Sequence, residues 1–334
     1  MESEQIGKDP VRGGYCESEF GVSLRNFWFG EFEFRIRAAT ELDLPPYKGS
    51  TFRGALGHAL RKLSCRCGED AEHTCAYGYL MESSALHAEK TEAQSPPHPL
   101  ILEPVLDHKQ IYTAGEEMFF KSVLIGNAID YLTYMVLAVH RMGETGVGRG
   151  RGEFILKSVE AWNLVGKETM YSADEPLLST SPPRITWRDI EDRASSEGHV
   201  ESVTLRFVTP LRFKSQGKLT GTAEMGFVPF MRNLLGRIAR LGRYYCGWDE
   251  RFDYRELVNM AEDVRVEDSD LRWRDWERYS SRQQTRMKLG GLLGYITFAG
   301  NLTLFLPYLM LGSHIHVGKN TVFGLGKYEV SRAL

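Results

Sequence analysis

The feature that most constrains the fold is a repeated order of signals: an alternating strand, a helix, and then a glycine-rich loop. Residues 146–149 (Gly-Val-Gly-Arg) and 324–327 (Gly-Leu-Gly-Lys) share the pattern glycine, apolar, glycine, basic. Apolar and polar residues alternate at 32–37 and again at 202–207, which predicts a half-buried strand near the beginning of each half. The repeat predicts an α+β chain with two related modules, and a split βαβ, ferredoxin-like unit fits the size of each.

Helices and strands can be placed more closely from the same periodicities. One helix is expected at about 51–63, with Ser50 or Thr51 as its N-cap, and another at about 227–245. A long apolar helix is expected at about 116–141, followed by the glycine loop and a strand at 153–159. Residues 87–104 carry four prolines and no sustained periodicity, which predicts a loop inside the first half.

The length of 334 residues favours two domains. Residues 172–184 are rich in Pro, Ser and Thr, which indicates a boundary. We therefore predict an N-terminal domain at 24–171 with a cysteine-bearing insertion, a linker at 172–198, and a C-terminal domain at 199–334.

Composition excludes several classes of protein. Hydrophobic residues make up 42% and charged residues 25%, which is typical of globular chains and not of disorder. No uninterrupted apolar run of about 18 residues occurs, and the N-terminus lacks the basic start and apolar stretch of a secretory signal. Five cysteines, an odd number, do not make a disulfide framework in a chain this long. We expect a cytoplasmic protein with no membrane association.

The net charge of −3 is unevenly distributed. Residues 202–248 hold eight basic residues and one acid, residues 249–279 hold eleven acids and six arginines, and residues 280–334 hold six basic residues and one acid. Separate blocks of opposite charge indicate either a polyanion partner on one face or solvated helix faces. The charge pattern alone leaves both readings open.

Common catalytic patterns are missing from the sequence. There is no HExxH, no Gly-x-Ser-x-Gly, no phosphate loop with its Ser or Thr, and no dinucleotide-binding glycine spacing. The remaining chemistry lies in the glycine loops, whose free N–H groups and basic neighbours suit phosphate oxygens. A tight turn between strands would also need the glycines, although not the basic residues.

Five segments carry a resemblance to a known family: 316–328, 52–60, the cysteine-bearing segment that ends at 77–80, 209–212 and 290–294. They resemble the RAMP superfamily of CRISPR-associated proteins, and more narrowly its precursor-crRNA-processing endoribonucleases, over about residues 30–330. The resemblance implies two tandem ferredoxin-like (RRM-like) domains with a C-terminal glycine-rich loop. It also implies that CRISPR repeat RNA is cleaved without a metal, by 2′-hydroxyl attack that leaves a 2′,3′-cyclic phosphate and a 5′-hydroxyl. The alternative is a non-catalytic RAMP subunit that binds guide RNA in a CRISPR effector complex, and either protein could be a monomer or a homodimer.

Metal-free RNA cleavage needs a base, an acid and cationic groups around the phosphorane, and histidine can serve as acid or base. On the helix 51–63 the apolar stripe is Phe52, Leu56, Ala59, Leu60 and Leu63. His58 lies on the opposite side with Arg61 and Lys62, where it is either a base that meets a phosphate or an ordinary surface residue. The family commonly uses a histidine near this helix with a tyrosine and a lysine, which implies the set His58, Tyr47 and Lys62.

His316 immediately precedes the glycine loop and is the second catalytic candidate. It could also only hydrogen-bond the loop or a phosphate, and His314 would share its face on a strand. The residues expected to bind RNA are basic or belong to the glycine loops: Arg149, Arg151, Arg232, Arg237, Arg240, Gly318, Lys319, Gly324, Gly326 and Lys327.

The cysteine-bearing segment offers four soft ligands within eleven residues: Cys65, Cys67, His73 and Cys75. Such ligands suit a structural zinc ion or an iron–sulfur centre. The alternative is a set of reduced thiols in a loop. Catalysis itself is expected to need no cofactor.

Overall fold

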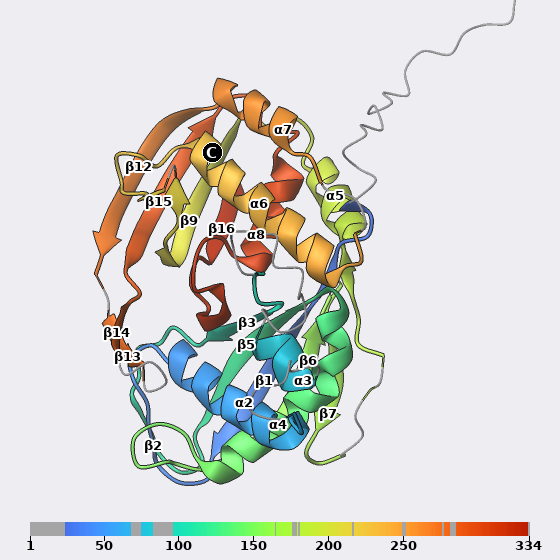
Figure 1. Cartoon of the computed structure of the whole chain (residues 1–334), viewed down its shortest axis with the longest axis vertical. Helices are drawn as coiled ribbons and strands as arrows, with labels where there is room; N and C mark the ends of the chain where they lie inside the picture. The colour runs from blue at the N-terminus through green and yellow to red at the C-terminus, as the bar shows by residue number, and fades with distance from the viewer. Residues whose placement is uncertain are drawn as a thin grey trace, which may run out of the picture.

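The computed structural model describes residues 24–67, 75–82, 96–163, 165–175, 179, 181–215, 217–248, 252–275, 277–280 and 285–332. Figure 1 shows two modules stacked along the long axis of the molecule, each with a sheet and helices, the N-terminal one below and the C-terminal one above. None of the helices in the described ranges has the length and apolar character needed to span a bilayer.

The N-terminal module is built on one antiparallel sheet with strand order β3-β5-β1-β6-β7. Its main elements, in chain order, are β1 (Trp28–Ala38), α2 (Gly49–Ser64), β3 (Leu100–Pro104), β5 (Glu117–Ile125), α4 (Leu132–Thr145) and β6 (Phe154–Trp162). Smaller elements surround them: β2 (Leu42–Asp43), α3 (Ala76–Met81), β4 (Ile111–Tyr112), η1 (Gly126–Tyr131), β7 (Lys167–Ser172) and β8 (Ile185–Thr186).

The C-terminal module is built on a second antiparallel sheet with strand order β12-β15-β9-β16. Its main elements are β9 (Ser202–Leu211), α6 (Phe227–Tyr245), β12 (Arg265–Arg274), β15 (Gly291–Ala299), α8 (Leu306–Ile315) and β16 (Tyr328–Arg332). Smaller elements are α5 (Trp187–Ser196), β10 (Lys214–Ser215), β11 (Lys218–Leu219), α7 (Arg255–Met260), η2 (Ala261–Asp263), β13 (Glu277–Ser280), β14 (Thr285–Lys288) and η3 (Thr321–Phe323).

Both modules follow the same path. Each runs strand, helix, strand, strand, helix, strand, and in each sheet the first strand lies between the third and the fourth. This is the split βαβ, ferredoxin-like arrangement. The two glycine loops occupy equivalent places, since each connects the second helix to the fourth strand. The prediction of two tandem α+β modules is confirmed.

Helix α2 shows why the first module packs as it does. Phe52, Leu56, Ala59 and Leu60 are buried on one stripe, which holds the helix on the sheet. Leu63 was expected on that stripe but is 38% exposed, because it lies in the last turn of the helix. The N-cap prediction is also wrong: the helix begins at Gly49 after Lys48, whose buried ammonium pairs with Asp107 at 2.8 Å.

Two other expectations are corrected. The single helix predicted at 116–141 is a strand, a 3₁₀ turn and a helix in succession: β5, η1 and α4. The break falls at Gly126, where φ is +61° and an added Cβ would lie 2.0 Å from the carbonyl oxygen of Tyr245. The proline-rich stretch 87–104 is not loop throughout, because its last five residues form β3.

The predicted linker 172–198 contains α5, which packs on α8 through the ring contact of Trp187 with Tyr308 at 5.0 Å. The modules also share one apolar core. Phe29, Ile125 and Ile101 of the first sheet are buried in the same cluster as residues of α6 and α8. This contact fixes one module against the other and creates the cavity between them.

Candidate functional site

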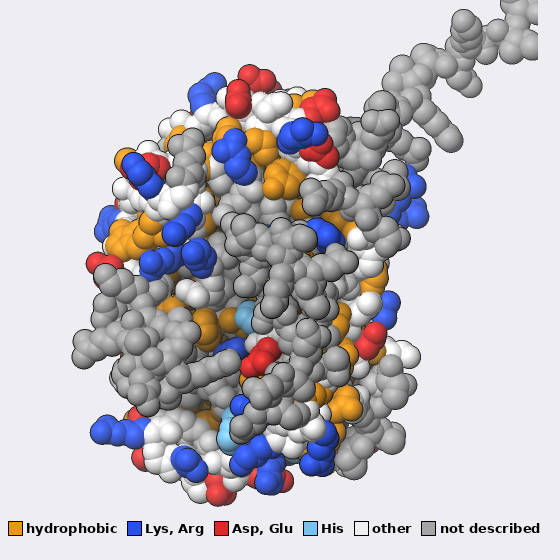
Figure 2. Space-filling view, in the orientation of Figure 1, with side chains coloured by type: hydrophobic (Ala, Val, Ile, Leu, Met, Phe, Trp, Pro, Cys, Tyr) orange, Lys and Arg blue, Asp and Glu red, His pale blue; other side chains and the backbone are white. Residues whose placement is uncertain are grey.

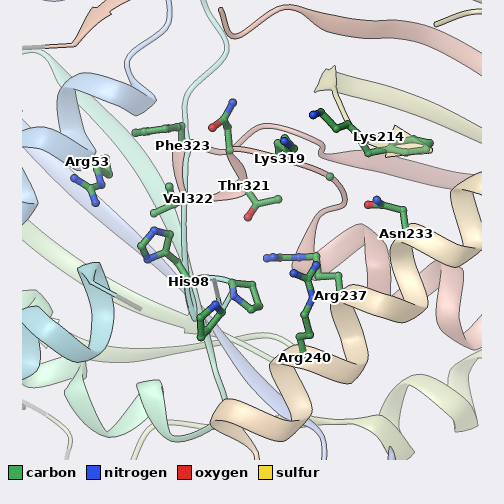
Figure 3. A pocket seen from close by; sticks show the side chains of 15 residues that line it. Arg53, His98, Lys214, Asn233, Arg237, Arg240, Lys319, Thr321, Val322 and Phe323 are labelled. Carbon is green, nitrogen blue, oxygen red and sulfur yellow. The ribbon is translucent and has the colours of Figure 1, made fainter. Parts of the chain in front are cut away.

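A cavity of about 590 Å³ lies between the modules, and we call it the glycine-loop cleft. Residues 318–323 of the C-terminal glycine loop form one wall and α6 forms another. Arg53 of α2 and His98, just before β3, complete it from the N-terminal module. In Figure 3, His98 lies between Arg53 on one side and Arg237 and Arg240 on the other.

The lining of the cleft is strongly cationic. It includes five basic residues and no acidic residue among the fifteen described residues that line it: Arg53, Lys214, Arg237, Arg240 and Lys319. Lys and Arg side chains also gather on the lower part of the C-terminal module, above the boundary between the modules (Figure 2). A concave surface of one sign concentrates anions, because its field lines are focused between low-dielectric walls.

His98 is the titratable group in the middle of these cations. It is partly buried, and its buried Nδ1 has no hydrogen-bond partner among the described residues. Burial, with the positive charges of Arg53 and Arg237, lowers the pKa of His98 to about 4. The imidazole is therefore neutral near pH 7 and can accept a proton.

Arg237 anchors the loop from below. Its guanidinium is buried and donates to the carbonyl oxygens of Ile315 at 3.0 and 3.1 Å and of His316 at 3.0 Å. Burial lowers the pKa of Arg237 to about 9, and it remains charged at neutral pH. It was predicted to bind RNA; in the structure it lines the cleft and also holds the chain where the glycine loop begins.

The glycines of the loop are required by the backbone conformation of the loop and by its close contacts with the rest of the protein. Gly324 and Gly326 have φ values of +83° and +74°, and an added Cβ at Gly326 would lie 1.8 Å from the carbonyl oxygen of Val317. Gly318 has φ +90° and lines the cleft, while Lys319, next to it, is exposed. The sequence predicted close approach to RNA at these glycines, and the structure shows close approach to the protein's own backbone at Gly326.

His316 is fully buried behind the loop. Its Nδ1 lies 3.0 Å from the carbonyl oxygen of Leu325, and its Nε2 lies 2.8 Å from the Glu103 carboxylate. Lys327 also binds Glu103. Burial alone would raise the pKa of Glu103, but His316 and Lys327 outweigh it and hold that pKa well below its usual range. Both nitrogens of His316 thus face protein acceptors, and the group ties β3 to the glycine loop.

The other catalytic candidates are not gathered in the cleft. Tyr47 precedes α2, and its hydroxyl donates to the carbonyl oxygen of Phe323 at 2.6 Å. His58 and Lys62 are exposed on α2. His58 lies roughly 13 Å along the helix axis from Gly49, given the rise per residue of an α-helix. His314 was expected on a strand but lies in α8, where it contacts Glu31 at 2.6 Å.

The remaining predicted RNA contacts are dispersed. Arg149 and Arg151 belong to the first glycine loop, which is bonded to β2 through the N–H of Arg149 and the carbonyl oxygen of Asp43 at 2.8 Å. Neither lines the glycine-loop cleft. Arg232 lines a separate cavity of about 440 Å³ beside β11. Arg240 lines the cleft and donates to the carbonyl oxygen of Gly236 at 3.2 Å.

Three of the four predicted metal ligands lie together. The sulfur atoms of Cys65, Cys67 and Cys75 all lie within 4.8 Å of one another. His73, the fourth, lies outside the described residues.

Sequence reasoning missed three residues of this region: Arg53, His98 and Glu103. The sequence around His98 could have drawn attention to it, because prolines on both sides restrict the backbone of His98. No local sequence pattern marks Arg53 or Glu103 as part of the site, since only the docking of the modules brings them to the glycine loop.

Two family models match the chain. Residues 27–183 match one described as an N-terminal domain, and residues 205–328 match that of the CRISPR-associated endoribonuclease Cas6. Among curated proteins, no significant match is found.

Solved structures share the fold at low sequence identity. A partial Cas6-RT-Cas1–Cas2 complex matches with a TM-score of 0.60 and 14% identity, over 92% of this chain and 46% of the other. Cas6 of Thermus thermophilus matches with a TM-score of 0.53 and 13% identity, over 91% of this chain and 99% of the other. A Cas6 product complex matches with a TM-score of 0.53 and 14% identity, again over 91% and 99%. This chain therefore spans less than half of the first chain but nearly all of the other two.

Proposed function

We propose that this chain, which belongs to the Cas6 family of CRISPR-associated endoribonucleases through its residues 205–328, cuts CRISPR precursor RNA within the repeats. The glycine-loop cleft would hold the phosphate that is cut. The observation that supports this assignment is the lining of the cleft, where five basic side chains and a neutral histidine, but no acid, stand among the described residues. Phosphate contacts supply most of the affinity of a protein for RNA, and an acidic neighbour would weaken them.

The proposed reaction is transesterification without a metal. A base takes the proton of the 2′-hydroxyl, and the oxygen attacks the adjacent phosphorus. The bond from phosphorus to the 5′-oxygen breaks as an acid donates a proton to that oxygen. The products are a 2′,3′-cyclic phosphate and a 5′-hydroxyl. Arg53, Arg240 and Lys319, which line the cleft, would stabilise the negative charge of the phosphorane.

The structure offers two candidates for the base. His98 lines the cleft, and its lowered pKa keeps the imidazole neutral, the form that can accept a proton. His58, with Lys62, serves if the RNA instead crosses the exposed side of α2. Tyr47 and His316 bind the glycine loop, so we assign them to holding the RNA path and not to proton transfer.

The test is single-turnover cleavage of the host's own repeat RNA in excess chelator. We expect cleavage there, and we expect one 2′-deoxy substitution just upstream of the cut to abolish cleavage while binding is kept. Cutting of the 2′-deoxy substrate would contradict the mechanism. Tight binding without any cleavage would instead favour the non-catalytic RAMP subunit, for which the same cleft would serve as a guide-RNA site.

A further inference from the structure

Three cysteines converge where α2 ends and α3 begins. Cys65 directly follows the last residue of α2, Cys67 lies two residues further on, and Cys75 directly precedes α3. All three are partly buried, and none of the described cysteines is disulfide-bonded. Their sulfur atoms lie within 4.8 Å of one another although the first and the last are ten positions apart in the sequence.

This spacing suits one metal ion. In a tetrahedral zinc–thiolate site the Zn–S distance of about 2.3 Å places the sulfurs about 3.8 Å apart, so small rotations about χ1 would bring these three onto a single ion. Thiolates are soft ligands that select zinc over the hard cations of solution. We propose that Cys65, Cys67 and Cys75 bind one zinc ion that fastens α3 to the end of α2. Each thiol loses its proton to solvent as its sulfur binds the ion.

The elements around the cysteine cluster show why a bound ion would stabilise the contact between α3 and α2. Helix α3 has only six residues, too few to be stable alone in water. Beside the cysteines, the hydroxyl of Ser64 joins α3 to α2: it accepts from the N–H of Tyr77 at 3.1 Å and donates to the carbonyl oxygen of Leu60 at 2.8 Å. A zinc ion at the thiols would add a further link at the same junction.

Helix α3 also connects the cluster to the boundary between the modules. Tyr79 stacks on Tyr131 with 4.8 Å between ring centroids and meets the ring of Tyr245 on α6 at 5.6 Å. At the other end of α3, the carbonyl oxygen of Met81 accepts from Arg53 at 3.3 Å. Arg53 lines the glycine-loop cleft. The zinc ion would therefore be structural, and through α3 it would steady one of the cationic side chains of the cleft.

The first measurement needs no variant. The full chain, prepared without a metal-affinity step, should contain about one zinc per molecule by elemental analysis. After removal of the metal, Co²⁺ should restore one equivalent and give the thiolate-to-metal charge transfer and visible bands of a tetrahedral site. Zinc well below one equivalent even after reconstitution would overturn the proposal. Iron with inorganic sulfide, or a mass showing a disulfide among the three cysteines, would also overturn it.

The second measurement tests the ligands. Cys67→Ser should weaken zinc binding by more than the roughly 10–100-fold that loss of an outer hydrogen-bond partner costs. Cys246→Ser is the matched control, because Cys246 is buried elsewhere, against the carbonyl oxygen of Trp28, and should leave the zinc content unchanged. Full zinc affinity in Cys67→Ser would refute the assignment. Circular dichroism separates loss of metal from loss of fold, and the Co²⁺ titration of the unaltered chain decides the question if Cys67→Ser does not fold.

Discussion

Two histidines beside the same loop differ in what their nitrogens meet. Both nitrogens of His316 face protein acceptors, whereas Nδ1 of His98 is buried at the cleft without one. A buried polar atom without a partner costs free energy unless a ligand supplies one. We therefore propose that His98 acts on the bound phosphodiester and that His316 shapes the loop.

The choice between the histidines can be tested directly. His98→Ala should lower the single-turnover rate by about 10²- to 10⁴-fold, the usual contribution of a general acid or base, with RNA affinity nearly kept. His58→Ala, on the exposed side of α2, should cleave close to the normal rate. His316→Ala should mainly lower the melting temperature, because Glu103 loses a buried partner.

The opposite ranking is informative as well. If His58→Ala is inactive while His98→Ala cleaves normally, the base lies on the outer face of α2, as the sequence predicted. Rates are to be measured at saturating enzyme, so that a loss of affinity is not mistaken for a loss of chemistry.

His98 also predicts a pH dependence of stability. Its pKa is about 4 in the folded chain and about 6.5 when unfolded, so the unfolded chain takes up the proton first as pH falls. The contribution of neutral His98 is fully present above pH 6.5 and is lost as pH falls toward 4. We expect the free energy of unfolding to drop by about 3 kcal/mol across this window, and we expect His98→Asn to remove that drop. Urea unfolding of the two proteins at several pH values measures it, and parallel curves would contradict the low pKa.

At the scale of elements, the glycine loop combines a backbone requirement with a charge. Gly326 cannot carry a Cβ without moving Val317, whereas Gly150 of the first loop has a similar φ of +76° and open space around it. Gly326→Ala should therefore lower the melting temperature well beyond Gly150→Ala, which suffers only the left-handed backbone cost of about 1 kcal/mol. Equal losses of melting temperature in the two variants, measured by calorimetry, would show that the loop backbone shifts to accommodate the added Cβ at little cost.

Lys319 should act through charge alone. Its side chain is exposed at the rim of the cleft, so Lys319→Ala should weaken RNA binding uniformly and reduce the slope of log affinity against log salt by about 1. Arg188→Ala, on the exposed face of α5, is the control that should leave both unchanged. An unaltered salt slope in Lys319→Ala would place the RNA elsewhere.

The elements also show how far the sequence alone could reach. Alternation and helical stripes predicted β1, α2, α6 and β9, because their periodicity reflects burial on one face. The helix predicted at 116–141 was wrong, because β5 is covered on both faces near its end and reads as continuously apolar, as a buried helix would. The site was predicted at its glycine loop but not at Arg53 or His98, which only the packing of α2 and β3 against that loop brings to it.

The whole molecule depends on the contact between its modules. The apolar cluster of the C-terminal module includes Phe29, Ile101 and Ile125 from the first sheet, all with no exposed surface. Such an interface resembles the interior of one domain and not a contact that opens. The cleft lies at this junction, so its cations keep their mutual positions only while both modules are docked.

We therefore expect the two modules to unfold together, in one transition reported alike by every probe. Leu156→Ala tests this, because Leu156 is buried in the cluster confined to the N-terminal module. The cavity should cost about 2–5 kcal/mol. If the modules are coupled, amides of β9, in the other module, should lose protection from hydrogen exchange as much as those of β1. Ile125→Ala, in the shared cluster, is the positive control and should expose both sheets equally. If β9 keeps its full protection in Leu156→Ala, the modules unfold separately, and the cleft can open without either module losing its fold.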